Sequence, residues 1–273
     1  MKSDFQTWGP HPLLETIHEL RFTITHAYYG QIPGFQGSDT LVQNRFYFCI
    51  EDCGEISWCL KDGKSATLAL PKGSLTFIPP NLNLTYNFKQ GMMTAFHFNL
   101  AIFPGLDIFE KEDSCYQSLD ELSICNKIYQ ALKGEDNLQN AMYVNSLLLQ
   151  SASNFCDDLD GMQQQIKLRK KYAELLDLID KHLDAQLGVG ELADLLSLSR
   201  DQLSKRFRRD IGIPLKHYLN KRIVNKASHL LSTGMNVRET AIELCFSSEF
   251  YFSRFFSTQT GLSPSDFRKQ YKN

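Results

Sequence analysis

The chain has 273 residues, of which 42% are hydrophobic and 22% charged, an ordinary composition for a globular protein and long enough for two domains. No run reaches the roughly 18 apolar residues of a spanning helix, so no membrane association is expected. The net charge of −2 conceals an asymmetry, since residues 166–273 carry 19 basic and 12 acidic side chains and residues 1–165 carry 10 and 19. Halves of opposite charge predict different partners.

The chain start and the cysteines indicate a cytoplasmic protein. Residues 1–10 contain no apolar stretch with a cleavage site, so a signal peptide is not expected. Seven cysteines, an odd number without paired spacing, fit a reducing compartment, and we expect them to be buried free thiols. The set Cys49, Cys53 and Cys59 lacks C-x-x-C spacing and a histidine cluster, so no metal or other cofactor is expected.

Residues 21–100 have the pattern of short strands rich in aromatic and branched residues. The pair Asp62-Gly63 predicts a tight hairpin between strands at 55–60 and 66–70. Further strands are expected at 46–50, 74–78 and 93–100. Strands at this spacing indicate an antiparallel sandwich or barrel.

Two helices follow, at about 119–132 and 138–156, where apolar residues recur at helical spacing. Two roles are equally compatible with this pattern: the helices close the barrel, or they form a dimer seam. The polar residues 161–171 are predicted to be a linker to a second, helical region that begins near residue 172.

The last hundred residues contain an internal repeat. Residues 193–199 read ADLLSLS and residues 241–247 read AIELCFS, an offset of 48 that becomes 49 after the turn. Each copy has the pattern of a short helix, a turn and a second amphipathic helix, which is a helix-turn-helix unit. Two such units in a basic segment predict recognition of double-stranded DNA.

The second helix of each unit is predicted to read bases. In the first copy Leu203 and Phe207 mark the buried side of a helix at 200–211, and the opposite side is polar and cationic. Arg254 falls at the position equivalent to Lys205, and its guanidinium can pair with guanine. Phe250 faces a thymine methyl or packs on a neighbouring helix. The expected base-facing residues are Asp201, Ser204, Lys205, Arg208, Arg209, Glu249, Phe250, Ser253 and Arg254.

A helix predicted at 214–231 would hold the two units at a fixed separation. Two helices that enter the same face of DNA must lie about one turn, roughly 34 Å, apart, and a stiff spacer satisfies this in a single chain. Cations along this helix and at the start of the second unit are candidate phosphate contacts. They are Lys216, Lys221, Arg222, Lys226 and Arg238.

Residues 172–270 resemble the DNA-binding domain of the AraC/XylS transcription regulators. The resemblance is densest from Ala241 to Arg268, and it implies DNA contacts by both units at the positions given above. Two departures stand out. Cys245 occupies a position where glycine is usual, which predicts an altered turn. Ser257 and Thr258 replace the usual lysines after Phe256, which predicts fewer phosphate contacts from the second unit.

The N-terminal region more weakly resembles the family's cupin-like sensing barrel, through residues 71–80 and His97-Phe98. Leu84 stands where a cupin metal site would have histidine, so neither metal nor catalytic residues are expected. In sugar-responsive relatives the barrel binds a small polar ligand, which implies a sugar-like effector here. The candidate effector-binding residues are His26, Arg45, Trp58, Tyr86 and His97.

These observations predict an α+β protein with a cupin-like antiparallel barrel and flanking helices at 1–160, a linker at 161–171, and an all-α domain of two helix-turn-helix units at 172–273. The predicted function is ligand-responsive transcription regulation by a homodimer, with RNA polymerase as a partner if the protein activates. One alternative is a constitutive regulator whose barrel only dimerises. The other is a cupin-type enzyme with a DNA-binding tail.

Overall fold

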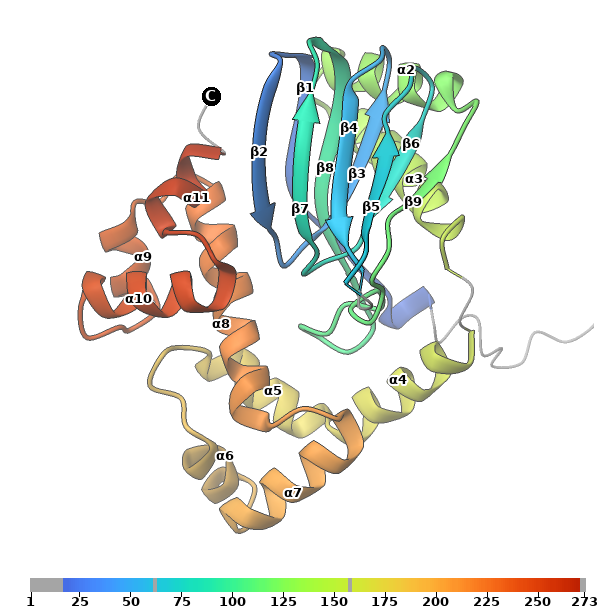
Figure 1. Cartoon of the computed structure of the whole chain (residues 1–273). Coiled ribbons are helices and arrows are strands. Elements are labelled where there is room, and N and C mark those ends of the chain that lie inside the picture. Colours follow the sequence, from blue (N-terminus) through green and yellow to red (C-terminus); the bar gives the residue numbers. More distant parts are fainter. Residues whose placement is uncertain (1–16, 61–62, 157–158, 271–273) are drawn as a thin grey trace, which may run out of the picture.

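The chain folds into a β-rich N-terminal part and a helical C-terminal part, shown in Figure 1. The computed structural model describes residues 17–60, 63–156 and 159–270. Residues 1–10, where no signal peptide is expected, and Asp62 of the predicted hairpin lie outside these ranges. Within them, no helix has the length and apolar character needed to cross a bilayer.

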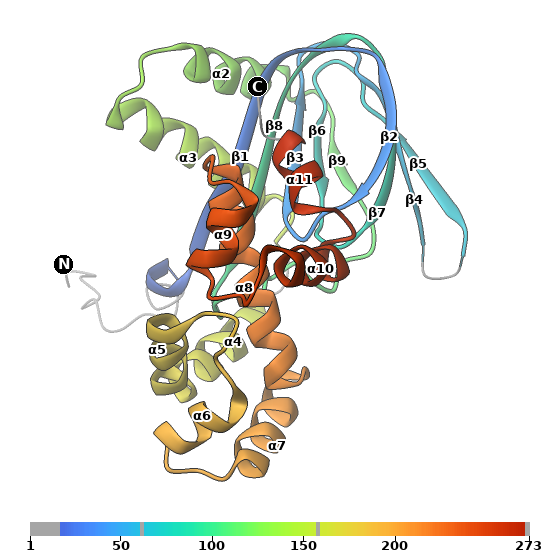
Figure 2. The same ribbon diagram turned by 90° about the vertical axis from the view of Figure 1, so that its left-hand side faces the viewer.

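The N-terminal part is built from two antiparallel sheets that face each other (Figure 2). One sheet has the strand order β1-β8-β3-β6-β9 and the other β2-β7-β4-β5. The antiparallel pairing of β4 with β5 confirms the predicted hairpin. The strands are β1 (Arg21–Ile32), β2 (Phe35–Thr40), β3 (Asn44–Cys49), β4 (Gly54–Cys59), β5 (Ser65–Ala69), β6 (Leu75–Ile78), β7 (Asn83–Phe88), β8 (Gly91–Ala101) and β9 (Tyr116–Ser118).

Two helices, α2 (Leu122–Lys133) and α3 (Leu138–Ser153), cover the outer face of the five-stranded sheet (Figure 2). Their apolar residues, such as Ile128 and Leu148, pack with the sheet in one core. The helices thus cover one sheet from outside, and neither of the two predicted roles is decided by this position. Leu138 and Met142 are exposed on α3, and a dimer seam there stays a prediction.

Strands β3 and β6 of the five-stranded sheet are buried on both faces, because successive side chains point to opposite faces and are mostly apolar. Along β3, Phe46 and Phe48 pack outward beneath the helices. Tyr47 and Cys49 pack inward with residues of the second sheet, among them Ile56. The space between the sheets is therefore a second core, separate from the one under the helices.

The C-terminal part is helical, and its two units lie at opposite ends of α8 (Figure 1). At about 1.5 Å per residue the 18 residues of α8 span roughly 27 Å. Tyr218 of α8 belongs to the first unit's core and Ala227 to the second unit's core. The helices are α5 (Ala173–His182), α6 (Val189–Leu195), α7 (Arg200–Ile211), α8 (Leu215–Ser232), α9 (Val237–Glu243), α10 (Glu249–Thr260) and α11 (Pro264–Gln270). The predicted α+β fold class is confirmed.

The polar segment at 161–171 is helical and belongs to α4 (Leu159–Lys171). Arg169 in this helix donates from Nη1 to the carbonyl oxygen of Ile102 at 3.0 Å and forms an ion pair with Glu19. The connecting segment is thus attached to the N-terminal part through its last turn. The domain limits at residues 160 and 172 stay a prediction.

The cysteines are all free, but they are not all buried as expected. Cys49, Cys53 and Cys125 are buried, whereas Cys59 and Cys245 are exposed. The expectation treated each cysteine as a small apolar residue, and it is wrong for these two because Cys59 ends a strand and Cys245 lies in a turn. Cys115 and Cys156 are partly buried.

The turn inside each helix-turn-helix unit contains a residue with left-handed backbone conformation. Ser197 has φ of 52° and Cys245, at the equivalent position, has φ of 56°. Left-handed φ brings Cβ close to the backbone and costs about 1–2 kcal/mol for a residue other than glycine. This geometry explains why glycine suits the position that Cys245 occupies.

We expect Cys245→Gly to raise the free energy of unfolding by about 0.5–1 kcal/mol, because relief of the left-handed strain exceeds the added chain entropy of glycine. Equilibrium denaturation by urea measures the change. Cys245→Ala is the matched control, since it removes the thiol and keeps Cβ. Equal stability of the glycine and alanine variants would show that backbone strain at this turn is not stored.

Candidate nucleic-acid interface

The two helix-turn-helix units have equivalent geometry. In each turn a backbone N–H closes on the first helix, from Leu198 to the carbonyl of Ala193 and from Phe246 to that of Ala241, both at 2.9 Å. Each unit thus consists of a short helix, α6 or α9, followed by a longer one, α7 or α10. The internal repeat in the sequence is a repeat in three dimensions.

Both longer helices are capped at each end. Ser199 accepts from the backbone N–H of Gln202 and forms a capping box with it, and Ser248 accepts from the N–H of Tyr251, each at 3.2 Å. The helices end at Gly212 and Gly261, which have φ of 88° and 77°. Serine caps and left-handed glycines fix the first and last residues of a helix. The sequence itself therefore sets the limits of α7 and α10.

The outer face of α7 is rich in charge. Leu203 and Phe207 are buried, as predicted, and the residues opposite them are exposed. Lys205 pairs with Asp201 one turn earlier at 3.2 Å, and both side chains are at least 80% exposed. Such a pair is weak, so Lys205 remains available to another anion. Of the other predicted base-facing residues in this unit, Arg208 and Arg209 are exposed and Ser204 is half-buried.

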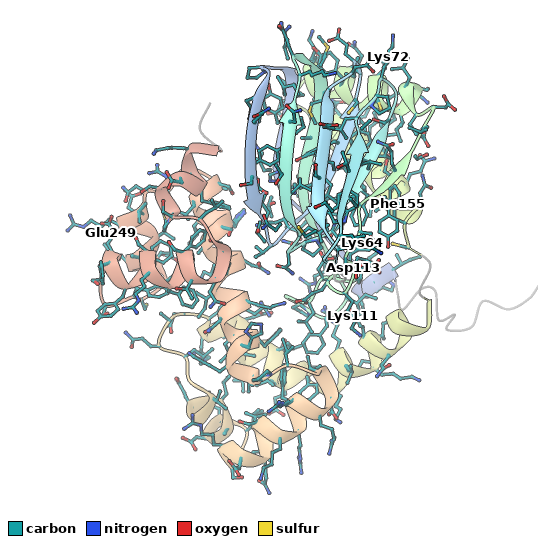
Figure 3. The ribbon with its side chains drawn as sticks, viewed as in Figure 1. Lys64, Lys72, Lys111, Asp113, Phe155 and Glu249 are labelled. Carbon is teal, nitrogen blue, oxygen red and sulfur yellow. The ribbon has the colours of Figure 1, made fainter. Side chains whose placement is uncertain are left out.

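The outer face of α10 has a different composition. Phe252 and Phe256 are buried, whereas Glu249, Phe250 and Arg254 are exposed. Ser253 is half-buried. Figure 3 shows Glu249 on the side of the C-terminal part that lies away from the sheets. The face therefore presents one acid, one aromatic ring and one guanidinium to the solvent.

The predicted phosphate-contacting residues divide into two groups. Lys216 and Arg238 are exposed, and Lys226 is half-buried with its ammonium donating to the carbonyl of Leu183 at 3.3 Å. Lys221 and Arg222 face the N-terminal part instead. This placement differs from the expected one, because α8 turns one side toward the barrel and both residues lie on that side.

Lys221 forms an ion pair with Glu110, which lies on the loop after β8. Figure 3 shows that loop, labelled at Lys111 and Asp113, at the end of the barrel that meets the helices. Arg222 donates from Nη2 to Asp180 at 2.5 Å and from Nη1 to the hydroxyl of Tyr218 at 3.0 Å. Lys221 therefore links α8 to the N-terminal part, and Arg222 links α8 to α5.

An apolar contact reinforces the junction. Phe103, from the loop after β8, is buried in the core of the first unit with Tyr172, Phe207 and Tyr218. Tyr218 also donates its hydroxyl hydrogen to the carbonyl of Pro104 at 2.6 Å. The sequence pattern did not single out Phe103, Glu110 or Asp180, since no local periodicity marks a residue whose partner lies a hundred positions away.

A cleft of about 490 Å³ lies beside this junction, between strands β1 and β8 and helix α8. Its lining is rich in hydrogen-bonding groups, and the pKa of the Lys221 ammonium is lowered by burial. Burial likewise raises the pKa of Asp107 to about 6, against opposing hydrogen bonds from Leu100, Phe109 and Asn44. The lining includes Arg21, Thr23, Asn99, Lys221, Arg222 and Asn225.

The predicted effector-binding residues come together elsewhere, between the two sheets. Buried Arg45 donates from Nη1 to Asp39 at 2.8 Å, and Tyr86 donates to the other oxygen of that carboxylate at 2.7 Å. Trp58 is buried in the same core. Asp39, the acceptor that joins Arg45 and Tyr86, has no marker in the sequence, because both of its partners are brought to it by folding.

The two histidines lie next to this network. His26 is opposite His97 in the β1–β8 pairing, with ring centroids 5.7 Å apart. Burial, followed by the charges of Arg45 and His26, holds the pKa of His97 well below its usual value. Among the described residues, no group of three His, Cys, Asp or Glu side chains is placed to hold a metal ion.

Comparisons with known proteins agree with this geometry. A family model described as a helix-turn-helix domain matches residues 192–270. An uncharacterized HTH-type transcriptional regulator from Escherichia coli, YijO, is 26% identical over 222 residues, 77% of each chain. The arabinose operon regulatory protein of the same organism is 27% identical over 173 residues, which cover 62% of this chain and 57% of that protein.

Solved structures share the complete fold. An apo ToxT variant from Vibrio cholerae superposes with a TM-score of 0.56 over 92% of this chain and 98% of that chain, at 15% identity. At such identity the likeness concerns the fold alone. Residues 192–270 form a helix-turn-helix domain, and the chain is similar to AraC/XylS-type DNA-binding transcription regulators.

Proposed function

We propose that this protein binds a specific DNA site through both helix-turn-helix units and adjusts transcription in response to a small polar effector. One observation carries the DNA-binding part: two helices, each with a serine N-cap and a glycine C-cap, expose a cation at equivalent positions, Lys205 and Arg254. Cations and polar groups on an exposed helix suit the major groove. The protein acts on transcription through binding and is not assigned an enzymatic activity.

The cleft between the barrel and α8 is the proposed effector site. Its volume suits a small molecule, and its amide and hydroxyl groups suit a sugar-like one. The cleft is lined by the cations Arg21, Lys221 and Arg222 and by the acids Asp107, Glu110 and Asp180. An effector that carries a carboxylate, such as a sugar acid, could replace one of these acids as the partner of a cation. In support, a ToxT structure is described as bound to an unsaturated fatty acid, also a carboxylic acid.

The position of Lys221 supplies a switch. Its partner Glu110 belongs to the N-terminal part and Lys221 to the helix that joins the two DNA-binding units. A carboxylate that enters the cleft competes with Glu110 for the ammonium. Binding would then loosen the link between the barrel and α8 and change how the two units are presented to DNA. The interior network around Arg45 and Asp39 keeps the barrel in shape in this scheme.

Arg254→Ala is expected to weaken specific DNA binding by about 1–3 kcal/mol and to relax preference at one base pair, because one bidentate contact to guanine is lost. The measurement is fluorescence anisotropy on a duplex selected from a random library by the wild-type protein, followed by selection with the variant. An unchanged base preference in the variant would contradict the assigned role of Arg254.

The two lysines on α8 should differ in salt dependence. Lys216 is exposed, so Lys216→Ala should reduce the slope of log affinity against log salt by about one unit. Lys221 is held by Glu110, so Lys221→Ala should leave that slope unchanged. DNA-binding titrations at four salt concentrations measure this slope for each variant. A smaller slope for Lys221→Ala would return this residue to the phosphate contacts predicted from the sequence.

Sugar acids should raise the melting temperature of the protein and neutral sugars of the same size should not, since binding stabilises the folded state. Lys221→Gln is expected to abolish the shift. Lys216→Gln, an exposed residue of the same helix outside the cleft, is the matched control and should retain it. A shift that survives in Lys221→Gln would place the effector elsewhere, with the barrel interior as the first alternative.

A further inference from the structure

Phe250 is the most exposed aromatic residue among the large hydrophobic side chains that the structure describes. It is 70% exposed and lies in the first turn of α10, and its neighbour Tyr251 is 59% exposed. Their rings meet edge to face with centroids 6.0 Å apart. Phe250 therefore leaves most of its ring in water, although the fold buries other phenylalanines of this unit, such as Phe252 and Phe256.

The first unit has a different residue at this position. Phe250 corresponds to Asp201, just as Arg254 corresponds to Lys205. In α7 these two positions form an ion pair with an N–O distance of 3.2 Å. In α10 the ion pair is impossible, since a phenyl ring replaces the carboxylate. The guanidinium of Arg254 has no acid one turn before it, and the second unit gains an apolar contact surface.

The groups around Phe250 indicate which kind of partner binds this surface. Phe250 and Arg254 are four residues apart and lie on one side of α10, and the exposed acid Glu249 lies in the same first turn as Phe250. The guanidinium of Arg254 favours an anionic partner, and the phenyl ring favours a partner that also offers an apolar group. In the major groove the only apolar group on a base edge is the C5-methyl of thymine, whereas O6 and N7 of guanine accept from arginine.

We infer that Phe250 is a specificity-determining residue that contacts the methyl group of a thymine, next to the guanine contacted by Arg254. Four residues of helix rise about 6 Å, so the two bases lie roughly two base steps apart. The two units are then unequal readers. The second unit recognises a methyl group and a guanine, and the first relies on charge. The inference rests on the DNA-binding function given above.

Single-atom changes in the DNA test this inference. A duplex is selected from a random library with the full chain, and each thymine is replaced in turn by deoxyuridine, which lacks only the methyl group. For the wild-type protein, one replacement within about two base pairs of the guanine assigned to Arg254 should weaken binding about three- to five-fold, the amount expected for one buried methyl group.

In Phe250→Ala that replacement should have no effect, while sensitivity to all other thymines persists. Phe250→Leu keeps an apolar side chain and should retain part of the methyl preference. Asp201→Ala, the equivalent change in the first unit, is the matched control and should lose none of it. Because the ring is exposed, each variant should keep the melting temperature of the wild type.

Two results would overturn the inference: no methyl-sensitive thymine near the Arg254 guanine, or equal methyl sensitivity in the wild type and in Phe250→Ala. The second result would assign the exposed ring to a protein partner instead. Failure of the proposed function looks different, since a chain that does not recognise DNA would enrich no duplex from the library at all.

Discussion

The position of the β-rich N-terminal part against the helical C-terminal part depends on the burial of Phe103 inside the first helix-turn-helix unit. The residue comes from the loop after β8, yet it shares a core with Tyr172, Phe207 and Tyr218. Loss of a buried phenylalanine side chain from a core costs about 3–5 kcal/mol of stability. The barrel is thereby anchored to a unit that carries a recognition helix. The adjacent cleft and the Lys221–Glu110 pair owe their positions to this anchor.

Apolar and ionic links act differently at this junction. Exposure of the apolar core around Phe103 to water is unfavourable, so this core holds the loop independently of the charges nearby. The ion pair can be exchanged, because any carboxylate that enters the cleft offers Lys221 the same interaction as Glu110. In the proposed scheme, the buried aromatic contact keeps the two parts together while an effector exchanges the ion pair. Helix α8 and the loop after β8 take part in both features. Helix α8 contributes Tyr218 to the core and Lys221 to the pair, and the loop contributes Phe103 and Glu110.

The two helix-turn-helix units have the same backbone structure and different exposed side chains. Caps, turns and buried positions agree between them, from the serine caps to the left-handed Ser197 and Cys245. The exposed positions diverge, with an intrahelical ion pair in one copy and an aromatic ring beside a guanidinium in the other. The shared residues set the conformation of both units, and the exposed residues that differ are the ones proposed to recognise DNA.

Local sequence determined the elements and the outward faces. Serine caps, left-handed glycines and apolar spacing act within a few residues, so the sequence alone predicts helices at 200–211 and 214–231, the hairpin at 55–70 and the exposure of Lys205 and Arg254. Tertiary structure decided the fate of residues whose partners are distant. Lys221 and Arg222 are predicted from the sequence as phosphate contacts, and folding brings Glu110 and Asp180 beside them as ion-pair partners. Asp39 likewise accepts hydrogen bonds from Arg45 and Tyr86 only in the folded chain, and these partners determine the properties of its carboxylate.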